Sequence, residues 1–275
     1  PSALAQQGAV SQWHANAQTL AASFTGRGNA AQAYTMALIQ VAVYDATVAV
    51  RGADSKNKRP AKPFIADIVA PTGADLNAAI ATAAFRVGYE RVNSNPTARS
   101  NYRNAYDAYL AGIPDGQAKT DGIAVGEATA RAVLAARSKD NFYNTATYSN
   151  PAATPGVWQS VLAATPYATA GANDYAMAFT MPLTAASPDA WRIKPPPRLA
   201  SGKYRRDFEE TKAYGALTST TRTPAMTNVV QFWTESGFTL WSRNVRDIVT
   251  ARGLDEFEAA RALAAFSVAT GDAML

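Results

Sequence analysis

The chain has 275 residues, 48% of them hydrophobic, which is enough to build the core of one large domain or two small ones. Its net charge of +5 comes with only 17% charged residues, and the basic ones are scattered, so we predict no nucleic-acid partner. Cysteine is absent, which excludes disulfides, thiolate metal sites and a cysteine nucleophile.

The distribution of apolar residues favours helices over strands along the whole chain. Alanine is abundant, Val and Ile are not concentrated in alternating runs, and most apolar stretches exceed ten residues. We therefore predict an all-α protein in which residues 1–275 form a single helical domain. The most apolar stretch predicts a central buried helix and no membrane span, because polar residues interrupt it at Gln32, Thr35, Gln40, Asp45 and Thr47.

Five helices are predicted in the first half of the chain. Their expected ranges are 3–24, 29–50, 72–92, 96–111 and 114–137. Thr72 with Asp75 resembles a capping box, and Asn95 precedes a proline at the first helical position. Pro114 is expected to open the next helix in much the same way. The last three helices are predicted to be antiparallel neighbours, since short loops join them.

Between about 138 and 202, Asn, Thr, Pro, Gly and aromatic residues dominate the sequence. We predict a long irregular loop region here, whose aromatic side chains pack on the rest of the domain. Helix is expected to resume near Ser201 and to run to about Tyr214. Thr223 should cap a further helix that stops before Gly253, and a last helix covers 254–273.

The first residues, Pro-Ser-Ala-Leu-Ala-Gln, place Ala3 and Ala5 at the A-x-A spacing of a signal-peptide cleavage site. Residues 1–5 are accordingly predicted to be a signal-peptide remnant. This feature predicts that the protein is periplasmic or secreted.

Two polar side chains in apolar helices are candidates for chemistry. His14 is the sole histidine, so zinc sites of the usual His/Cys kind and a Ser-His-Asp arrangement lack partners, and we interpret it as a surface or packing residue. Asp45 lies in the most apolar helix, where a buried carboxylate requires a hydrogen-bond or cationic partner. We expect that partnership to be structural rather than catalytic.

Five residues in the second half of the chain are candidates to line a pocket. They are Lys194, Arg198, Arg222, Trp233 and Arg243. Aromatic residues at this density more often belong to a core, which is the alternative for Trp233.

Nine short segments spread over residues 30–272 occur in an order that is typical of one protein family. They are AVYDA (42–46), IPDGQAK (113–119), GIAVG (122–126), PGVW (155–158), PPP (195–197), YRRDFEETK (204–212), STTRT (219–223), FW (232–233) and ARGL (251–254). Taken together they resemble the bacterial vanadium-dependent haloperoxidases, which are related to the type-2 phosphatidic acid phosphatases and bacterial acid phosphatases. The resemblance implies a helical bundle of that type.

The resemblance also implies an active site that binds vanadate or phosphate through Lys, Arg, a Ser-Gly-His element and a second histidine. Those motifs are absent from this sequence: Arg59-Pro60 is in the wrong place along the chain, and Ser201-Gly202 is followed by Lys203 instead of histidine. We therefore predict no catalytic, cofactor-binding or metal-binding residue in this chain alone. Vanadate or phosphate would bind only if a C-terminal partner completes the site.

Two functions follow from these observations. In the first, the chain is the helical N-terminal half of a haloperoxidase-like or phosphatase-like protein, completed by a C-terminal segment or second polypeptide that packs on the helices from 222 to 275. In the second, it is a non-catalytic helical interaction or scaffold protein that has lost the site. The first predicts a large exposed apolar face on these helices, and it is compatible with a homo-oligomer.

Overall fold

The computed structural model describes residues 8–54, 61–149, 151–158 and 174–275, and the predicted signal-peptide remnant lies outside them. Within these ranges the chain forms nine α-helices and two short 3-10 helices, with no strand. The prediction of an all-α protein is confirmed.

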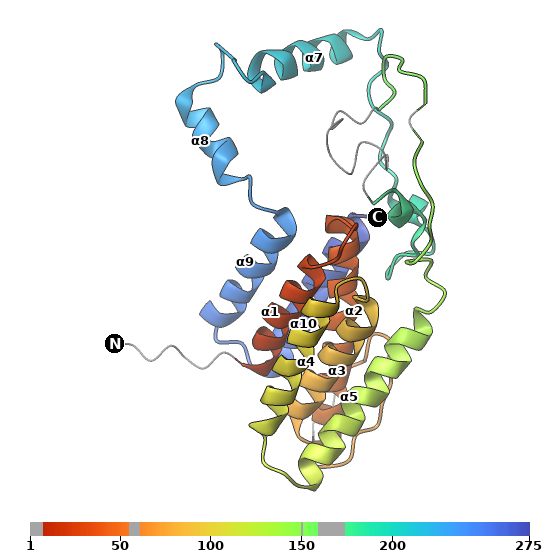
Figure 1. The fold of residues 1–275 in the computed structure, drawn as a ribbon, viewed down its shortest axis with the longest axis vertical. Helices are drawn as coiled ribbons and strands as arrows, with labels where there is room; N and C mark the ends of the chain where they lie inside the picture. The colour runs from red at the N-terminus through yellow and green to blue at the C-terminus, as the bar shows by residue number, and fades with distance from the viewer. Residues whose placement is uncertain (1–7, 55–60, 150, 159–173) are drawn as a thin grey trace.

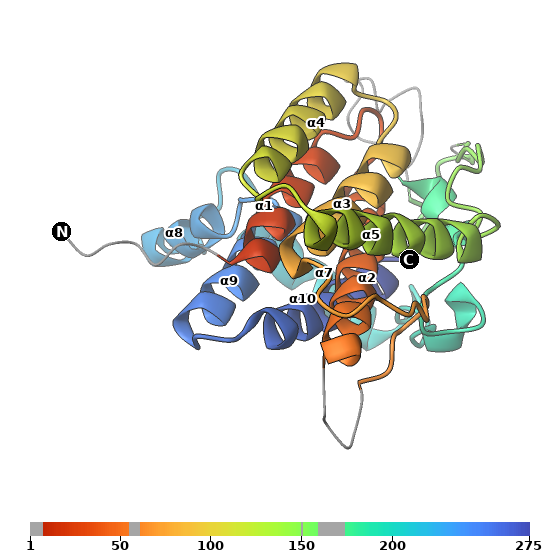
Figure 2. The same ribbon diagram turned by 90° about the horizontal axis from the view of Figure 1, so that it is seen from below.

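The centre of the bundle is helix α2, Asn29–Asp54. It packs against α1 (Ala9–Ala22), α3 (Leu76–Arg91) and α10 (Glu256–Ala273), and also contacts α5 and α9 (Figure 2). Residues Asn29–Gly52 are long and apolar enough to cross a membrane by composition, but 89% of the apolar window is buried inside the protein. Burial on nearly every side accounts for a helix that is apolar almost all round.

Helices α4 (Pro96–Ala111) and α5 (Gln117–Ala136) both pack on α3. The approach of α5 to α3 depends on two glycines in the GIAVG segment. A Cβ atom on Gly126 would lie 2.6 Å from the carbonyl oxygen of Ala79, and one on Gly122 would collide with the carbonyl oxygen of Asp75. The absence of side chains at these positions lets the two helix backbones meet closely.

Helix α4 is held to the bundle by aromatic side chains. The ring of Tyr106 stacks on Phe85 of α3 with centroids 4.2 Å apart, and the rings of Tyr102 and Tyr109 each make a T-shaped contact with Trp13, with centroids 5.6 Å apart. Offset and edge-on contacts of this kind add to the stabilisation that comes from burial alone. A helix with few aliphatic residues is thereby fixed to α1 and α3.

Most helix starts lie where the sequence predicts them. The side chains of Asn95, Ser201 and Thr223 accept hydrogen bonds from backbone N–H groups in the first turns of α4, α7 and α8. Three starts were predicted too early. Helix α1 begins after Gly8, whereas its predicted start at residue 3 lies outside the described residues. Helix α3 begins after Asp75, whose own side chain forms the cap, and α5 begins after Gly116, whose φ of 155° suits glycine.

The single helix predicted from Thr223 to Gly253 is two helices in the structure, which corrects that expectation. Helix α8 (Pro224–Phe232) ends where the N–H of Trp233 bonds to the carbonyl groups of Val229 and Val230. Helix α9 (Gly237–Ala251) begins after a short turn. The Arg243 side chain binds Glu235 of that turn through two hydrogen bonds of 2.8 Å, so the break between the helices has its own ion pair.

Three carboxylates fasten distant segments to helix ends and loops. Each accepts two backbone N–H groups: Glu256 from Ala9 and Val10, Asp174 from Gly28 and Ala30, and Asp272 from Leu183 and Thr184. Two of the carboxylates satisfy N–H groups at helix starts, where a negative charge is also favourable. The last helix and the loop region are tied to the N-terminal helices in this way.

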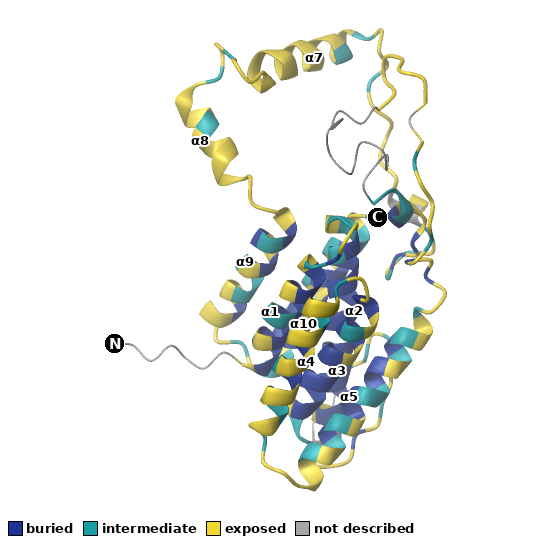
Figure 3. Ribbon diagram, viewed as in Figure 1, coloured by how far each residue is buried: buried dark blue, intermediate teal, exposed yellow. Residues whose placement is uncertain are grey.

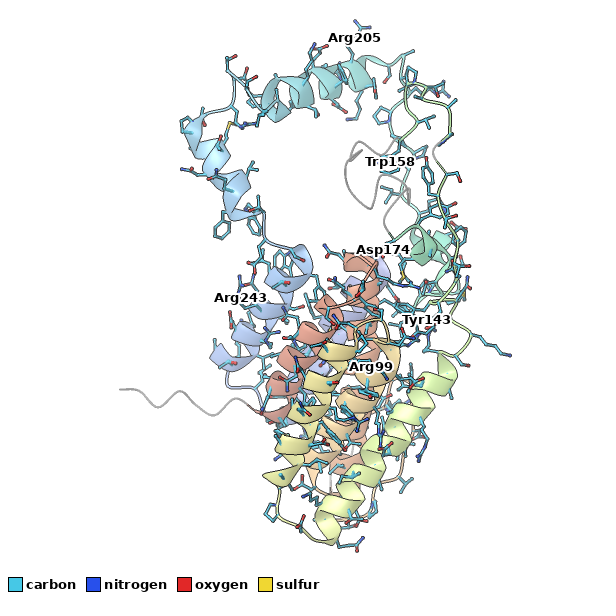
Figure 4. The ribbon with its side chains drawn as sticks, in the orientation of Figure 1. Arg99, Tyr143, Trp158, Asp174, Arg205 and Arg243 are labelled. Atoms are coloured by element: carbon cyan, nitrogen blue, oxygen red, sulfur yellow. The ribbon has the colours of Figure 1, made fainter. Side chains whose placement is uncertain are left out.

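The loop region predicted at about 138–202 is irregular wherever it is described, apart from the 3-10 helices η1 (Tyr175–Phe179) and η2 (Pro188–Trp191). Its contact with the bundle centres on Phe142, which is fully buried and stacks on Tyr34 of α2. The predicted packing of its aromatic side chains holds only in part, because Trp158 and Phe179 are 52% and 46% exposed. Figure 4 shows Tyr143 and Asp174 where this region meets the bundle. From here the chain leaves the bundle and enters α7 (Gly202–Gly215) (Figure 1).

Candidate functional site

Helices α7 and α8 form an arm that extends beyond the end of the bundle where the C-terminus lies (Figure 1). Neither helix has a buried residue, and Figure 3 shows the arm as exposed along nearly all its length. Apart from Tyr204, which is partly buried, its larger apolar side chains are at least 40% exposed: Phe208, Tyr214, Leu217, Met226, Val229, Val230, Phe232 and Trp233. Exposure of so many apolar groups in one segment is typical of an interaction surface.

The apolar face predicted for residues 222–275 is present on the outer helices and absent on the last one. Phe232, Trp233 and Trp241 have 69%, 54% and 53% of their surfaces exposed. By contrast, Leu263 of α10 is fully buried, and Phe257 is partly buried beside Tyr44 of α2. The exposed surface is therefore formed by α8 and α9, because α10 covers α2 and belongs to the core.

The five predicted pocket residues lie in separate parts of the structure. Lys194 and Arg198 are exposed in the segment before α7, and Trp233 is at the end of α8. Arg243 is on the outer side of α9 and binds Glu235 (Figure 4). No hydrogen bond or ion pair joins any two of the five, all of which are described.

Arg222, the fifth of these residues, holds together the turn between α7 and α8. Its Nη1 donates to the carbonyl oxygens of Tyr214 and Ala216 at 2.6 and 3.1 Å, and its Nε donates to the hydroxyl of Thr227 at 3.2 Å. A guanidinium that binds several carbonyl groups fixes the direction of the chain. Arg222 therefore sets the angle at which α8 leaves α7.

His14 is fully buried, and its Nδ1 lies 2.9 Å from Nη1 of Arg246 on α9. Because an arginine can only donate, Nδ1 is the acceptor and the neutral ring carries its proton on Nε2. Burial, with the nearby Arg246 charge, lowers the pKa of His14 to about 3. The sole histidine thus has the packing role predicted for it, and it joins α1 to α9.

This burial predicts a pH dependence of stability. The unfolded state binds a proton at His14 below about pH 6.5, whereas the folded state does not until about pH 3, so stability is lost as the pH falls through this window. Between pH 7 and pH 5 the His14 contribution to the free energy of unfolding should fall by about 2 kcal/mol. Urea unfolding of the wild type and of His14→Gln at both pH values measures it. An equal loss in the two proteins would contradict the prediction.

Asp45 has the hydrogen-bond partners that its burial requires. Its carboxylate accepts from the backbone N–H groups of Phe64, Ile65 and Ala66 at 2.6, 2.9 and 2.7 Å. Burial raises the pKa of Asp45 above its ordinary value, while these three donors act in the opposite direction. The residue fastens the segment after α2 back onto that helix, which agrees with the structural role predicted.

Sequence reasoning missed a buried ionic network where α3 and α5 meet the loop region. Asp140 and Arg91 form an ion pair with side chains that are 3% and 4% exposed, and the Tyr34 hydroxyl donates to the same carboxylate at 3.1 Å. Burial and the charge of Asp140 raise the pKa of Tyr34, which stays protonated. Arg137 donates to the Tyr34 hydroxyl and to the carbonyl groups of Met181 and Pro182.

A surface hollow of about 600 Å³ lies beside this network and is lined by Arg91, Arg137 and Lys139. The two arginines are already bound to Asp140 and to carbonyl groups, so they serve primarily to hold the loop region in place. Within the described residues, no group of three or more His, Asp or Glu side chains is placed to hold a metal ion. Comparison with known protein families, curated proteins and solved structures finds no match.

Proposed function

We propose that this chain is the helical scaffold of a protein resembling the vanadium-dependent haloperoxidases or the related phosphatases. Its vanadate or phosphate ligands would come from a C-terminal segment or a second polypeptide that packs on α8 and α9. The observation that carries this proposal is the apolar surface formed by Phe232, Trp233 and Trp241, which have more than half of their surfaces exposed. The order of the nine sequence segments supports the choice of family.

The residues of this chain do not by themselves fit the anion site that the resemblance implies. Such a site needs two histidines, whereas His14 is buried with Nδ1 bound to Arg246. Ser201, in the Ser-Gly pair, is the cap of α7. No catalytic step is therefore assigned to any residue here, and we propose that the contribution of the chain is to position the segment that carries the ligands. We further propose that the assembly acts in the periplasm or outside the cell.

A non-catalytic interaction or scaffold protein is the second candidate. Two arginines that could have bound an anion favour it, because they already have partners: Arg222 binds carbonyl groups between α7 and α8, and Arg243 of α9 binds Glu235. In this case the α8–α9 surface binds a protein partner, and no anion takes part.

The mass of the natural protein distinguishes the two candidates. We expect denaturing and native mass spectra of the purified natural material to show additional mass, either as a companion polypeptide or as a longer single chain. Its peptides should contain the Ser-Gly-His and second-histidine elements. Halide oxidation or phosphate release should then follow when vanadate or a phosphate ester is supplied. A single species of 29.1 kDa without a companion would overturn the proposal and leave the non-catalytic scaffold.

A pair of variants tests whether the exposed surface is responsible. Replacing both Phe232 and Trp233 by serine should release the companion, or, in one continuous polypeptide, should expose the ligand-bearing segment to proteolysis. Val69 is 93% exposed in the segment between α2 and α3, outside the α8–α9 surface. Val69→Ser is therefore the control and should leave the association unchanged. Equal behaviour of the two variants would show that the α8–α9 surface is not the contact.

A further inference from the structure

An apolar cavity of about 200 Å³ lies between α2, α9 and α10, close to the C-terminal end of α10. Its walls include Met36, Phe238, Trp241 and Phe266. No acidic, basic or histidine side chain is among the described residues that line it. A dry apolar cavity of about 150 Å³ is known to hold a benzene ring, so this volume accommodates one ring and a small substituent.

Two serine hydroxyls distinguish this cavity from a simple packing defect. Ser242 of α9 and Ser267 of α10 line it, and each residue is only 3% exposed. Neither side chain makes a hydrogen bond within the described part of the chain, whereas the neighbouring Thr270 hydroxyl donates to the carbonyl oxygen of Phe266 at 2.8 Å. Neither oxygen is among the fully buried polar atoms that lack a partner, so both hydroxyls stay accessible and can bond to a molecule in the cavity.

We propose that this cavity is a binding site for a small uncharged ligand with one aromatic ring and a hydroxyl group. The rings and thioethers of the wall would cover the aromatic part, and the Ser242 and Ser267 hydroxyls would bond to the polar group. The lack of a charged side chain in the wall selects against carboxylates and amines, since their charge would lose its hydration without a counter-ion. The inference does not rest on the proposed function, but the two share Trp241, which lines the cavity and also belongs to the α8–α9 surface.

Fluorine NMR with three probes of similar size tests the chemical class. The probes are 4-fluorobenzyl alcohol, 4-fluorotoluene, which lacks the hydroxyl, and 4-fluorobenzoate, which is charged. We expect the alcohol to bind about fivefold more tightly than the toluene, in line with one hydrogen bond, and the benzoate to bind at least about tenfold more weakly than the alcohol. Absence of alcohol binding at millimolar concentration, or tighter binding of the benzoate, would overturn the proposal.

Variants then locate the site. Ser242→Leu fills the cavity and should weaken binding of the alcohol by more than about tenfold, the loss expected from removing the space for a ring. Ser100 is exposed on α4, so Ser100→Leu makes the same chemical change elsewhere and should bind as the wild type does. The double variant Ser242→Ala, Ser267→Ala leaves the space open and should abolish the preference for the alcohol over the toluene. If Ser242→Leu does not fold, the double alanine variant alone tests whether the ligand binds in this cavity. An unchanged preference in the alanine variant, or equal binding in a folded Ser242→Leu, would refute the site.

Discussion

Replacing Gly126 by valine should lower the free energy of unfolding by about 3 kcal/mol, the upper range for forcing extra atoms into a close-packed interface. Even the first carbon atom of a side chain there would lie 2.6 Å from both the Ala79 carbonyl oxygen and the Thr82 Cβ. These atoms belong to the α3 backbone and the base of a side chain, so neither can rotate away. Thermal unfolding followed by circular dichroism should show a fall in Tm of about 6–12 °C for a protein of this size.

The control for this substitution is Gly52→Ala near the end of α2. A Cβ atom at Gly52 would meet nothing within 4 Å, and alanine favours a helix over glycine by up to about 1 kcal/mol. The control should therefore be as stable as the wild type or slightly more stable. If Gly126→Val were equally harmless, the close contact of α3 and α5 would be wrong.

Replacing Asp140 by alanine should cost about 3–5 kcal/mol, because it leaves the buried Arg91 guanidinium without a counter-ion. The change also removes the acceptor for the N–H of Phe142, which bonds to Oδ1 at 3.0 Å, and one of the two acceptors near the Tyr34 hydroxyl, the other being the carbonyl oxygen of Met181. The loop region would lose its attachment beside Phe142. Urea unfolding should show the lower stability, and limited proteolysis should show faster cleavage between residues 138 and 201.

Asp189 provides the matched control, since it is also paired with an arginine. Its ion pair with Arg192 is exposed, with side-chain exposures of 67% and 76%. Exposed pairs contribute at most about 1 kcal/mol, so Asp189→Ala should change stability little. A similar decrease in the free energy of unfolding for both variants would show that burial does not determine the contribution of the Arg91–Asp140 pair.

Much of the helical framework was predictable because its signals are local. The caps at Asn95, Ser201 and Thr223 depend on residues within one turn, and the central position of α2 follows from an apolar pattern within one helix. The local signal for the break between α8 and α9 is the turn dipeptide Ser236-Gly237, which was outweighed by the helical pattern on both sides of it. The turn is also stabilised by the Glu235–Arg243 ion pair, eight residues apart.

The candidate site was less predictable because it depends on contacts between distant segments. Nothing near Asp140 in the sequence reveals that Arg91, 49 residues away, is its buried partner. In the same way, the Ser242 and Ser267 hydroxyls become notable only when α9 and α10 meet beside α2. The hypothesis that a missing partner packs on residues 222–275 correctly predicted that Phe232 and Trp233 are exposed. It could not predict that Leu263 is buried, because this depends on the packing of α10 against α2.

The position of α10 affects the order in which the chain can fold. α10 makes the most extensive contact with α2, and its Glu256 holds the start of α1, nearly 250 residues earlier in the chain. At a synthesis rate of about 5–20 residues per second, on the order of 10–40 s would pass between the synthesis of the apolar α2 and that of α10, which covers it. We therefore expect the newly made chain to need a chaperone, or rapid release from the ribosome, to keep α2 from aggregating. We also expect its folding to be slow for an all-helical protein.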